Sequence, residues 1–201
     1  MNRCFSSDNG VLFNKAKTKL IQYPVGKTDV EYTVPEGVTT IGDYSFFSCV
    51  NLNNIKMPRE LKTIEKGAFK ECTDLDNVEI PKGATYIGGQ AFHGCGGLNQ
   101  IVISETVTNI DMDAFNGCDN LTIYGIANSY AEKYANENGI NFSALEEFIV
   151  ENGVLIEYNG SGGDIVIPGD MRITSIGKYV FCNNQSITSV KIPDGIELIG
   201  D

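Results

Sequence analysis

The sequence has one histidine, few cations and no long apolar segment, and each shortage excludes a class of protein. His93 is the only histidine among 201 residues, so no site with several histidine ligands can form. The 15 Lys and Arg residues are outnumbered by 26 Asp and Glu residues, giving a net charge of -11. That balance argues against binding to nucleic-acid phosphates or to anionic lipid. No apolar run approaches the roughly 18 residues of a membrane span, so we expect no membrane insertion.

The first residues, MNRCFSSDNGVLF, also lack the apolar segment and small-residue cleavage site of a signal peptide. If the protein is secreted, we expect its signal to lie outside this chain or to have been removed. The remaining composition, 42% hydrophobic and 20% charged, is that of a folded protein. The chain is long enough to bury a sizeable core.

A 23-residue period runs through the first part of the chain. It is carried by isoleucines at Ile41, Ile64, Ile87 and Ile110, each followed at fixed distances by a phenylalanine, a cysteine and a leucine. The phenylalanines are Phe46, Phe69, Phe92 and Phe115; the cysteines are Cys49, Cys72, Cys95 and Cys118; the leucines are Leu52, Leu75, Leu98 and Leu121. Four copies in fixed phase indicate a stacked repeat.

Each repeat alternates apolar and polar residues in a way that is typical of strands. We predict parallel strands at Asn54–Met57, Asn77–Ile80 and Gln100–Ile103, and a second short extended segment around Leu61 and Ile64. Segments such as GAFKEC are expected to form tight helical turns that direct the phenylalanine inward. One repeat cannot bury its own apolar face, whereas stacked repeats build a continuous core. The pattern therefore predicts a solenoid in which the residues that vary between repeats face solvent.

The segment ANSYAEKYANENGINF predicts one short amphipathic helix, near residues 129–138. Ser129 followed by Glu132 fits a capping box, and Gly139 fits a helix stop. The expected apolar face consists of Tyr130, Ala131, Tyr134 and Ala135. We expect this helix to cover the end of the first stack.

The sequence predicts that one arrangement, an opening hairpin followed by repeats, occurs twice in the chain. ENGVLIEYNGSGGDIVIP echoes the opening DNGVLFNKAKTKLIQYPVGK, and both read as a strand, a turn and a second strand. We therefore expect residues 1–145 to hold an opening hairpin, four repeats and the terminal helix. Residues 146–201 would hold a second hairpin and the truncated start of a second block, with Asn184 in the cysteine position. The last repeat stops at Asp201, so we expect a fragment of a longer solenoid that self-associates through uncapped ends.

The repeat VPEGVTTIGDYSFFSCVNLNNIKM and its three successors resemble the BspA-like leucine-rich-repeat motif IPxxVTxIGxxAFxxCxxLxxIxI. The resemblance covers nearly the whole chain. It implies an α/β solenoid, a right-handed leucine-rich-repeat coil with mostly short parallel strands and short helical turns. It also implies a bacterial cell-surface or secreted protein, located outside the cell. Relatives have been linked to adhesion and to host or matrix binding.

The sequence offers no convincing chemistry. Stacked cysteines would lie about 4.8 Å apart in a straight row, which cannot converge into a tetrahedral zinc site. We expect Cys49, Cys72, Cys95 and Cys118 to be buried, reduced core residues without metal. His93 is expected to be an exposed bystander. The glycine-rich stretch from Asn159 to Gly163 lacks the Lys-Ser/Thr of a phosphate loop and reads as a hairpin turn. We expect no catalytic residue, cofactor or metal.

Two functions remain open. In the first, the chain is a non-catalytic interaction module that binds a protein or glycan through the outward residues of its repeated strands. These residues, the candidate interaction face, are Asn54, Lys56, Asn77, Glu79, Gln100 and Val102. In the second, it is a structural spacer within a larger surface protein. A binding module should show a pocket or an exposed apolar or aromatic strip, yet the expected surface positions are mild and contain no aromatic cluster.

Overall fold

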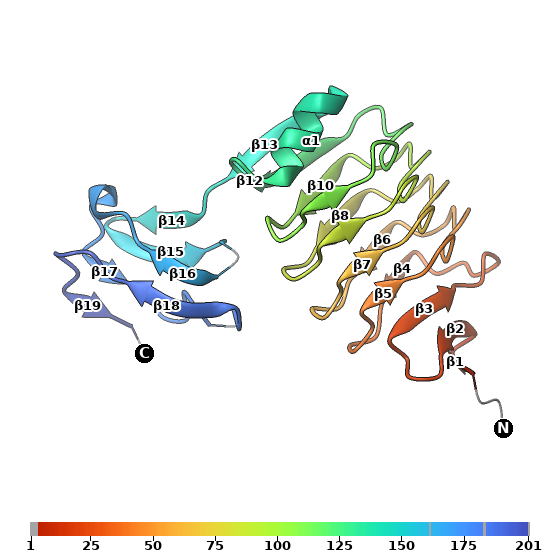
Figure 1. Ribbon diagram of the computed structural model, residues 1–201, viewed down its shortest axis with the longest axis horizontal. Helices are drawn as coiled ribbons and strands as arrows, with labels where there is room; N and C mark the ends of the chain where they lie inside the picture. Colours follow the sequence, from red (N-terminus) through yellow and green to blue (C-terminus); the bar gives the residue numbers. More distant parts are fainter. Residues whose placement is uncertain (1–3, 161, 183, 201) are drawn as a thin grey trace. The chain divides into compact units, whose positions relative to one another are not determined.

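The computed structural model describes residues 4–160, 162–182 and 184–200. The chain divides into two compact units, Met1–Ala144 and Leu145–Asp201, and each is a stack of mostly parallel strands (Figure 1). The described residues include one α-helix, α1 (Tyr130–Asn138), in the first unit. Within these residues, no helix has the length and apolar character needed to cross a membrane.

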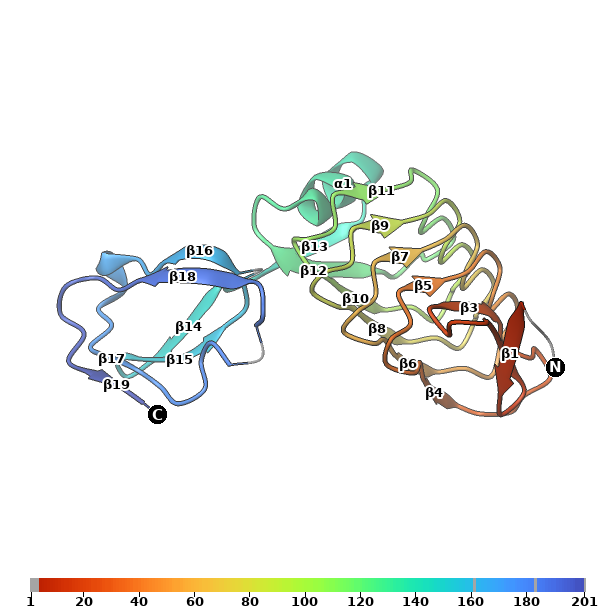
Figure 2. The ribbon, with the colours of Figure 1, turned by 60° about the horizontal axis from the view of Figure 1, so that its bottom comes forward.

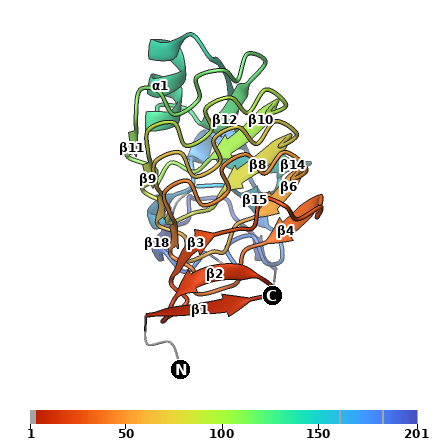
Figure 3. The same ribbon diagram turned by 90° about the vertical axis from the view of Figure 1, so that its right-hand side faces the viewer.

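The first unit is a β-solenoid whose two sheets lie on different sides of the coil (Figure 2, Figure 3). One sheet has the order β1-β2-β3-β5-β7-β9-β11. Its strands are β1 (Phe5–Asp8), β2 (Val11–Asn14), β3 (Lys19–Gln22), β5 (Thr40–Ile41), β7 (Thr63–Ile64), β9 (Tyr86–Ile87) and β11 (Asn109–Ile110). The other sheet has the order β13-β12-β10-β8-β6-β4. Its strands are β4 (Glu31–Thr33), β6 (Asn54–Lys56), β8 (Asn77–Ile80), β10 (Gln100–Ile103), β12 (Thr122–Ile126) and β13 (Asn141–Leu145).

The predicted strands of the repeats are confirmed. β6, β8 and β10 pair in parallel, with Asn54 opposite Asn77 and Asn77 opposite Gln100. β8 and β10 have the predicted bounds, and β6 ends at Lys56, one residue early. The second short extended segment is also present, because β5, β7, β9 and β11 pair in parallel at the repeating isoleucines. Each coil therefore adds one strand to each sheet.

An antiparallel hairpin opens the first unit. β1 and β2 are joined at Asn9 and Gly10, which have φ angles of 47° and 84°. Positive φ at both central residues is the geometry of a tight hairpin turn, for which Asn-Gly is the preferred pair. β2 pairs antiparallel with β3, and β3 then pairs in parallel with β5. The hairpin thus extends the edge of the sheet on which the coils stack.

The expected helical turns are absent from the described repeats, which instead contain hydrogen-bonded turns. In the third repeat, Gln90 and Gly94 adopt φ angles of 57° and 73°, and such left-handed residues interrupt a helix. The Phe92 amide donates to the Ala114 carbonyl at 2.8 Å, and the Gly94 amide donates to the Asn116 carbonyl at 2.8 Å. Alternate N–H groups therefore bond to the next coil, whereas a helix would use them within itself.

A column of stacked aromatic side chains runs through the first unit, and we call it the aromatic column. It consists of Tyr23, Phe46, Phe69, Phe92, Phe115 and Tyr134, with neighbouring ring centroids 5.1, 4.9, 5.1, 5.3 and 5.8 Å apart. The phenylalanine rings are nearly parallel to one another, and all four are buried. The prediction that Phe69 and Phe92 stack on adjacent coils is confirmed.

Helix α1 covers the end of this column, as predicted. Ser129 caps the helix by accepting a hydrogen bond from the Glu132 amide at 3.4 Å, and Gly139 ends it at a φ of 67°. Tyr134 is buried and meets Phe115 edge to face. Its hydroxyl donates to the Met112 carbonyl at 3.2 Å, which satisfies the polar end of the ring. The helix packs against β12 and β11.

The second unit repeats the plan with its own core. Its elements are β14 (Phe148–Glu151), β15 (Val154–Tyr158), β16 (Gly163–Val166), η1 (Gly169–Met171), β17 (Ser175–Ile176), β18 (Ile187–Lys191) and β19 (Leu198–Ile199). β14 and β15 form an antiparallel hairpin, while β15-β17-β19 and β16-β18 pair in parallel. Leu198 and Ile199 are 66% and 54% exposed. Self-association through this end stays a prediction.

The prediction of a hairpin turn between Asn159 and Gly163, a stretch in which Ser161 lies outside the described residues, is wrong. That stretch follows β15 and leads into β16, and these two strands belong to different sheets. The hairpin instead turns at Asn152 and Gly153, where φ is 51° and 80°. The sequence reading missed the strands that precede both Asn-Gly pairs, β1 and β14.

The aromatic column gives a direct test of which residues face inward. We expect Phe69→Ala and Phe92→Ala each to lower the free energy of unfolding by roughly 3–5 kcal/mol, because each leaves a cavity between two neighbouring rings. Asn77→Ala and Glu79→Ala should change it by no more than about 0.5 kcal/mol, as is usual for exposed sites. Thermal and denaturant unfolding of the four variants beside the parent measures this. If Glu79→Ala were as damaging as Phe69→Ala, the assignment of inward and outward positions would be wrong.

Candidate interaction face

The outward side of the six-stranded sheet is set by strand alternation. In β6, β8 and β10 the residues Ile55, Val78 and Ile101 are buried, so the residues before and after them point outward. The parallel register then places equivalent residues of successive coils side by side. The result is two outward columns, which differ in chemistry.

All six residues of the predicted interaction face line one open depression. It has a volume of about 640 Å³, and Met57, Arg59 and Pro81 also line it. The structure therefore brings the predicted residues together. Arg59 was missed by the sequence reading because it follows the strand and Pro58 and lies outside the alternating pattern. Strand periodicity does not show that its side chain reaches this surface.

The first column of the interaction face is a row of amides. Asn54, Asn77 and Gln100 lie opposite one another on neighbouring strands, and Thr122 continues the row on β12. Each amide side chain has two N–H donors and an acceptor oxygen, and one N–H of Asn77 is already used because its Nδ2 donates to Asp76 Oδ2 at 2.9 Å. Neighbouring strands are about 4.8 Å apart, so the row presents a donor and an acceptor at that interval. Such a row suits a ligand with regularly repeated polar groups.

The second column changes character from charged to apolar. Lys56 and Glu79 are exposed, while Val102 is half-buried and lies opposite the half-buried Tyr124 of β12. Among the described residues, neither Lys56 nor Arg59 forms a salt bridge. The cations therefore lie near β6, and an apolar pair lies near β12.

An exposed aromatic pair lies on the first coil, outside the outward strand columns that were expected to contain no aromatic cluster. Tyr44 and Phe47 are 39% and 40% exposed, and their rings contact edge to face with centroids 6.2 Å apart. They belong to the turn segment rather than to the sheet. Gly67 and Lys70 occupy the equivalent positions of the next coil. The pair is a local feature of one coil, so the residues that recur at equivalent repeat positions do not reveal it.

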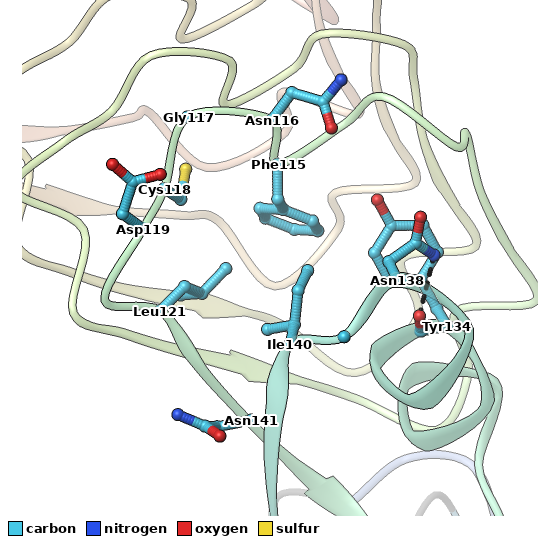
Figure 4. Close-up of a pocket in the computed structure, with 11 residues that line it drawn as sticks. Phe115, Asn116, Gly117, Cys118, Asp119, Leu121, Tyr134, Asn138, Ile140 and Asn141 are labelled. Atoms are coloured by element: carbon cyan, nitrogen blue, oxygen red, sulfur yellow. Dashed lines mark hydrogen bonds between the residues drawn. The ribbon is translucent and has the colours of Figure 1, made fainter.

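A smaller cavity of about 270 Å³ lies at the end of the first stack (Figure 4). Phe115, Cys118, Asn138 and Ile140 are among its lining residues, and the Asn138 amide donates to the Tyr134 carbonyl at 2.8 Å. Tyr134 continues the aromatic column beyond Phe115, whereas the row of repeated cysteines ends at Cys118. The cavity therefore follows from how the helix caps the coil, and we assign it no ligand.

The four repeated cysteines are buried, as predicted, and they also form hydrogen bonds that were not expected. The thiols of Cys72, Cys95 and Cys118 donate to carbonyls of the preceding coil, those of Phe46, Phe69 and Phe92, with Sγ–O distances of 3.0, 3.0 and 3.1 Å. Among the described residues, no cluster of His, Cys, Asp or Glu could hold a metal ion.

Burial raises the pKa of each of these thiols above the usual value of 9.0. The pKa of Cys49 rises to about 11, and those of Cys72 and Cys118 rise to about 12. The pKa of Cys95 is also raised, mainly by desolvation. Because the thiolate is the reactive form, the raised pKa values keep these cysteines in the less reactive thiol form at neutral pH.

The expectation of an exposed His93 is wrong. The residue is half-buried, and its Nδ1 atom is buried without a hydrogen-bond partner among the described residues. The backbone explains this position, because the turn is hydrogen-bonded to both neighbouring coils: the Glu71 amide donates to the His93 carbonyl at 2.8 Å, and the Gly94 amide donates to the Asn116 carbonyl. A helical turn projecting into solvent would have left the ring exposed.

The buried thiols predict selective protection from alkylation. Below pH 9, iodoacetamide should leave Cys49, Cys72, Cys95 and Cys118 unmodified in the native protein, because they are shielded and protonated. In denaturant the same four residues should react. Peptide mapping by mass spectrometry measures the difference. Rapid modification of Cys95 without unfolding would contradict the burial described here.

The raised thiol pKa values also predict how stability depends on pH. In the unfolded chain these thiols ionise near pH 9.0, whereas Cys72 in the folded protein ionises only near pH 12. Above pH 9 the unfolded state therefore releases protons first, and rising pH favours unfolding. We expect the melting temperature to fall from about pH 9 upwards. Cys72→Ala should show a shallower fall than the parent; equal slopes would exclude this thiol as a cause.

Two solved bacterial proteins are similar to part of this chain. A leucine-rich cell-surface protein from Faecalibacterium prausnitzii is 28% identical, with a TM-score of 0.48, over 67% of this chain and 42% of that one. The pneumococcal vaccine antigen PcpA is 20% identical, with a TM-score of 0.50, over 72% of this chain and 48% of that one. This chain thus spans less than half of either structure. A search of curated proteins gave no match.

The assignment of the chain to a family rests on its sequence. Residues 28–152 and 158–201 match the BspA type leucine-rich repeat region, in six copies. The match includes the repeated strands, the aromatic column's phenylalanines and the cysteine positions described above. The chain therefore belongs to the BspA-type leucine-rich-repeat family.

Proposed function

We propose that the chain is a non-catalytic interaction module of a cell-surface or secreted bacterial protein, and that it binds a protein or glycan in an adhesive role. The observation that carries the proposal is the single depression lined by all six residues of the interaction face. Family membership supports a location outside the cell. Family membership alone does not define a ligand, since one repeat frame serves many partners.

The alternative is a structural spacer. A spacer needs the stacked core but places no demand on outward residues. Here the outward residues of neighbouring coils converge on one hollow, and two cations in it lack salt bridges among the described residues. That arrangement favours binding. We also propose that the coil is right-handed, as connections between parallel strands nearly always are.

Variants of the interaction face should separate binding from spacing. The parent would be screened on an array of glycans and matrix proteins, and each ligand found would be titrated against Asn77→Ala and Gln100→Ala. Removing one hydrogen-bonding amide should weaken binding by roughly threefold to tenfold while leaving the melting temperature unchanged. Asn136→Ala, at an exposed position of α1, is the matched control.

Equal binding by all three variants would place the ligand elsewhere and reject this face. An array without any ligand would favour the spacer. The melting temperatures serve as the folding control, so a loss of binding cannot be confused with unfolding.

A further inference from the structure

We infer that the depression on β6, β8 and β10 binds an acidic polysaccharide, with Lys56 and Arg59 holding its carboxylate or sulfate groups. This inference rests on the proposed function and narrows it to one class of ligand. Three features of the depression support it: its cations, its row of amides and the apolar pair beside it.

The cations are the first feature. The chain carries 15 Lys and Arg residues against 26 Asp and Glu residues, so a site with more cations than acids departs from the average. Lys56 and Arg59 line the depression together with one acid, Glu79. Neither cation forms a salt bridge among the described residues, although Arg59 interacts electrostatically with the neighbouring Glu60, which an anionic ligand would have to outcompete. The arginine fork also matches the geometry of a carboxylate or sulfate.

The amides are the second feature. Asn54, Asn77 and Gln100 repeat at one per strand across the depression. A sugar hydroxyl is both donor and acceptor, and an amide side chain can serve both roles. A linear polysaccharide lying across the strands would meet a matching amide on each coil. A single small anion would need only one of them.

The apolar pair gives the ligand a direction. Val102 lies opposite Tyr124, and both are half-buried on the side away from the cations. The C–H face of a sugar ring packs well against such a surface, with the tyrosine as the larger contact. We therefore place an acidic group near Lys56 and Arg59, and a sugar ring near Val102 and Tyr124.

An acidic protein segment is the less favoured ligand. Tight protein interfaces centre on well-packed apolar or aromatic anchors that fill pockets. This depression is open, and its exposed outward residues are polar or charged. It offers hydrogen bonds and charge over a broad surface, which suits a hydroxyl-rich chain better than an apolar anchor.

The test uses four soluble polymers as probes: polygalacturonate with carboxylates, chondroitin sulfate with sulfates, neutral dextran, and poly-L-glutamate as the acidic polypeptide. Binding to the whole chain would be measured by calorimetry at two salt concentrations. We expect one or both acidic polysaccharides to bind, more weakly at high salt because screening reduces exposed charge interactions. Dextran should not bind, and poly-L-glutamate should bind at least about tenfold more weakly than the acidic polysaccharide.

The double variant Lys56→Ala/Arg59→Ala should bind the acidic polysaccharide at least about tenfold more weakly. Arg59→Lys should lose part of the affinity, because it keeps the charge but not the fork. The control Lys15→Ala/Lys66→Ala removes the same charge from two exposed lysines outside the depression, and it should bind normally. Tyr124→Ala should weaken binding at unchanged salt dependence.

Several outcomes would overturn the inference: equal binding of dextran, preferred binding of poly-L-glutamate, equal losses in the control variant, or no binding of either acidic polysaccharide. The proposed function is tested separately from this inference. If the array yields a neutral glycan or a protein whose binding is weakened by Asn77→Ala, the interaction face stands and only the acidic class of ligand fails.

Discussion

The stacking of each coil on the next is the constraint on which the rest of this structure depends. A single coil contributes one phenylalanine, and that ring is covered only when coils above and below supply the next rings. Stability is therefore shared between neighbours, as in other repeat arrays. The rings at the two ends of the column are tyrosines, and such rings can fill the core while their hydroxyls hydrogen-bond to polar groups beside it. Tyr23 and Tyr134 do so, with hydroxyls bonded to the Asp29 carboxylate and the Met112 carbonyl.

This constraint divides the chain into fixed and free positions. Inward positions must keep the size and shape of their column, whereas outward strand positions meet no such demand. The outward side chains of successive coils are nevertheless held side by side by the same parallel register. Substitutions at outward strand positions can thus create a ligand-binding surface without disturbing the core. Lys56, Glu79 and Val102 occupy equivalent positions and differ completely in chemistry.

The strands, the helix and the aromatic column could be predicted because each depends on residue types that occur at fixed spacings in the sequence. Phe69 and Phe92 repeat in phase, and Ser129 with Glu132 and Gly139 marks both ends of α1. The turn segments could not be predicted this way. Their amides bond to the next coil, 22 residues on, so the deciding partner is distant in sequence. The depression was predictable in its strand residues, but Arg59 reaches it from beyond the strand, and the signals for β1 and β14 lay in overlooked Asn-Gly pairs.

The two units together show what the cysteine position does. In the first unit, the thiols of Cys72, Cys95 and Cys118 each donate to a carbonyl of the preceding coil. In the second unit Asn184 occupies that position, and its amide donates to the Gly160 carbonyl at 3.0 Å. The residues share a small size and a hydrogen-bond donor but no redox or metal chemistry. The position therefore serves to join coils, whereas the residues of the outward columns are free to vary in chemistry.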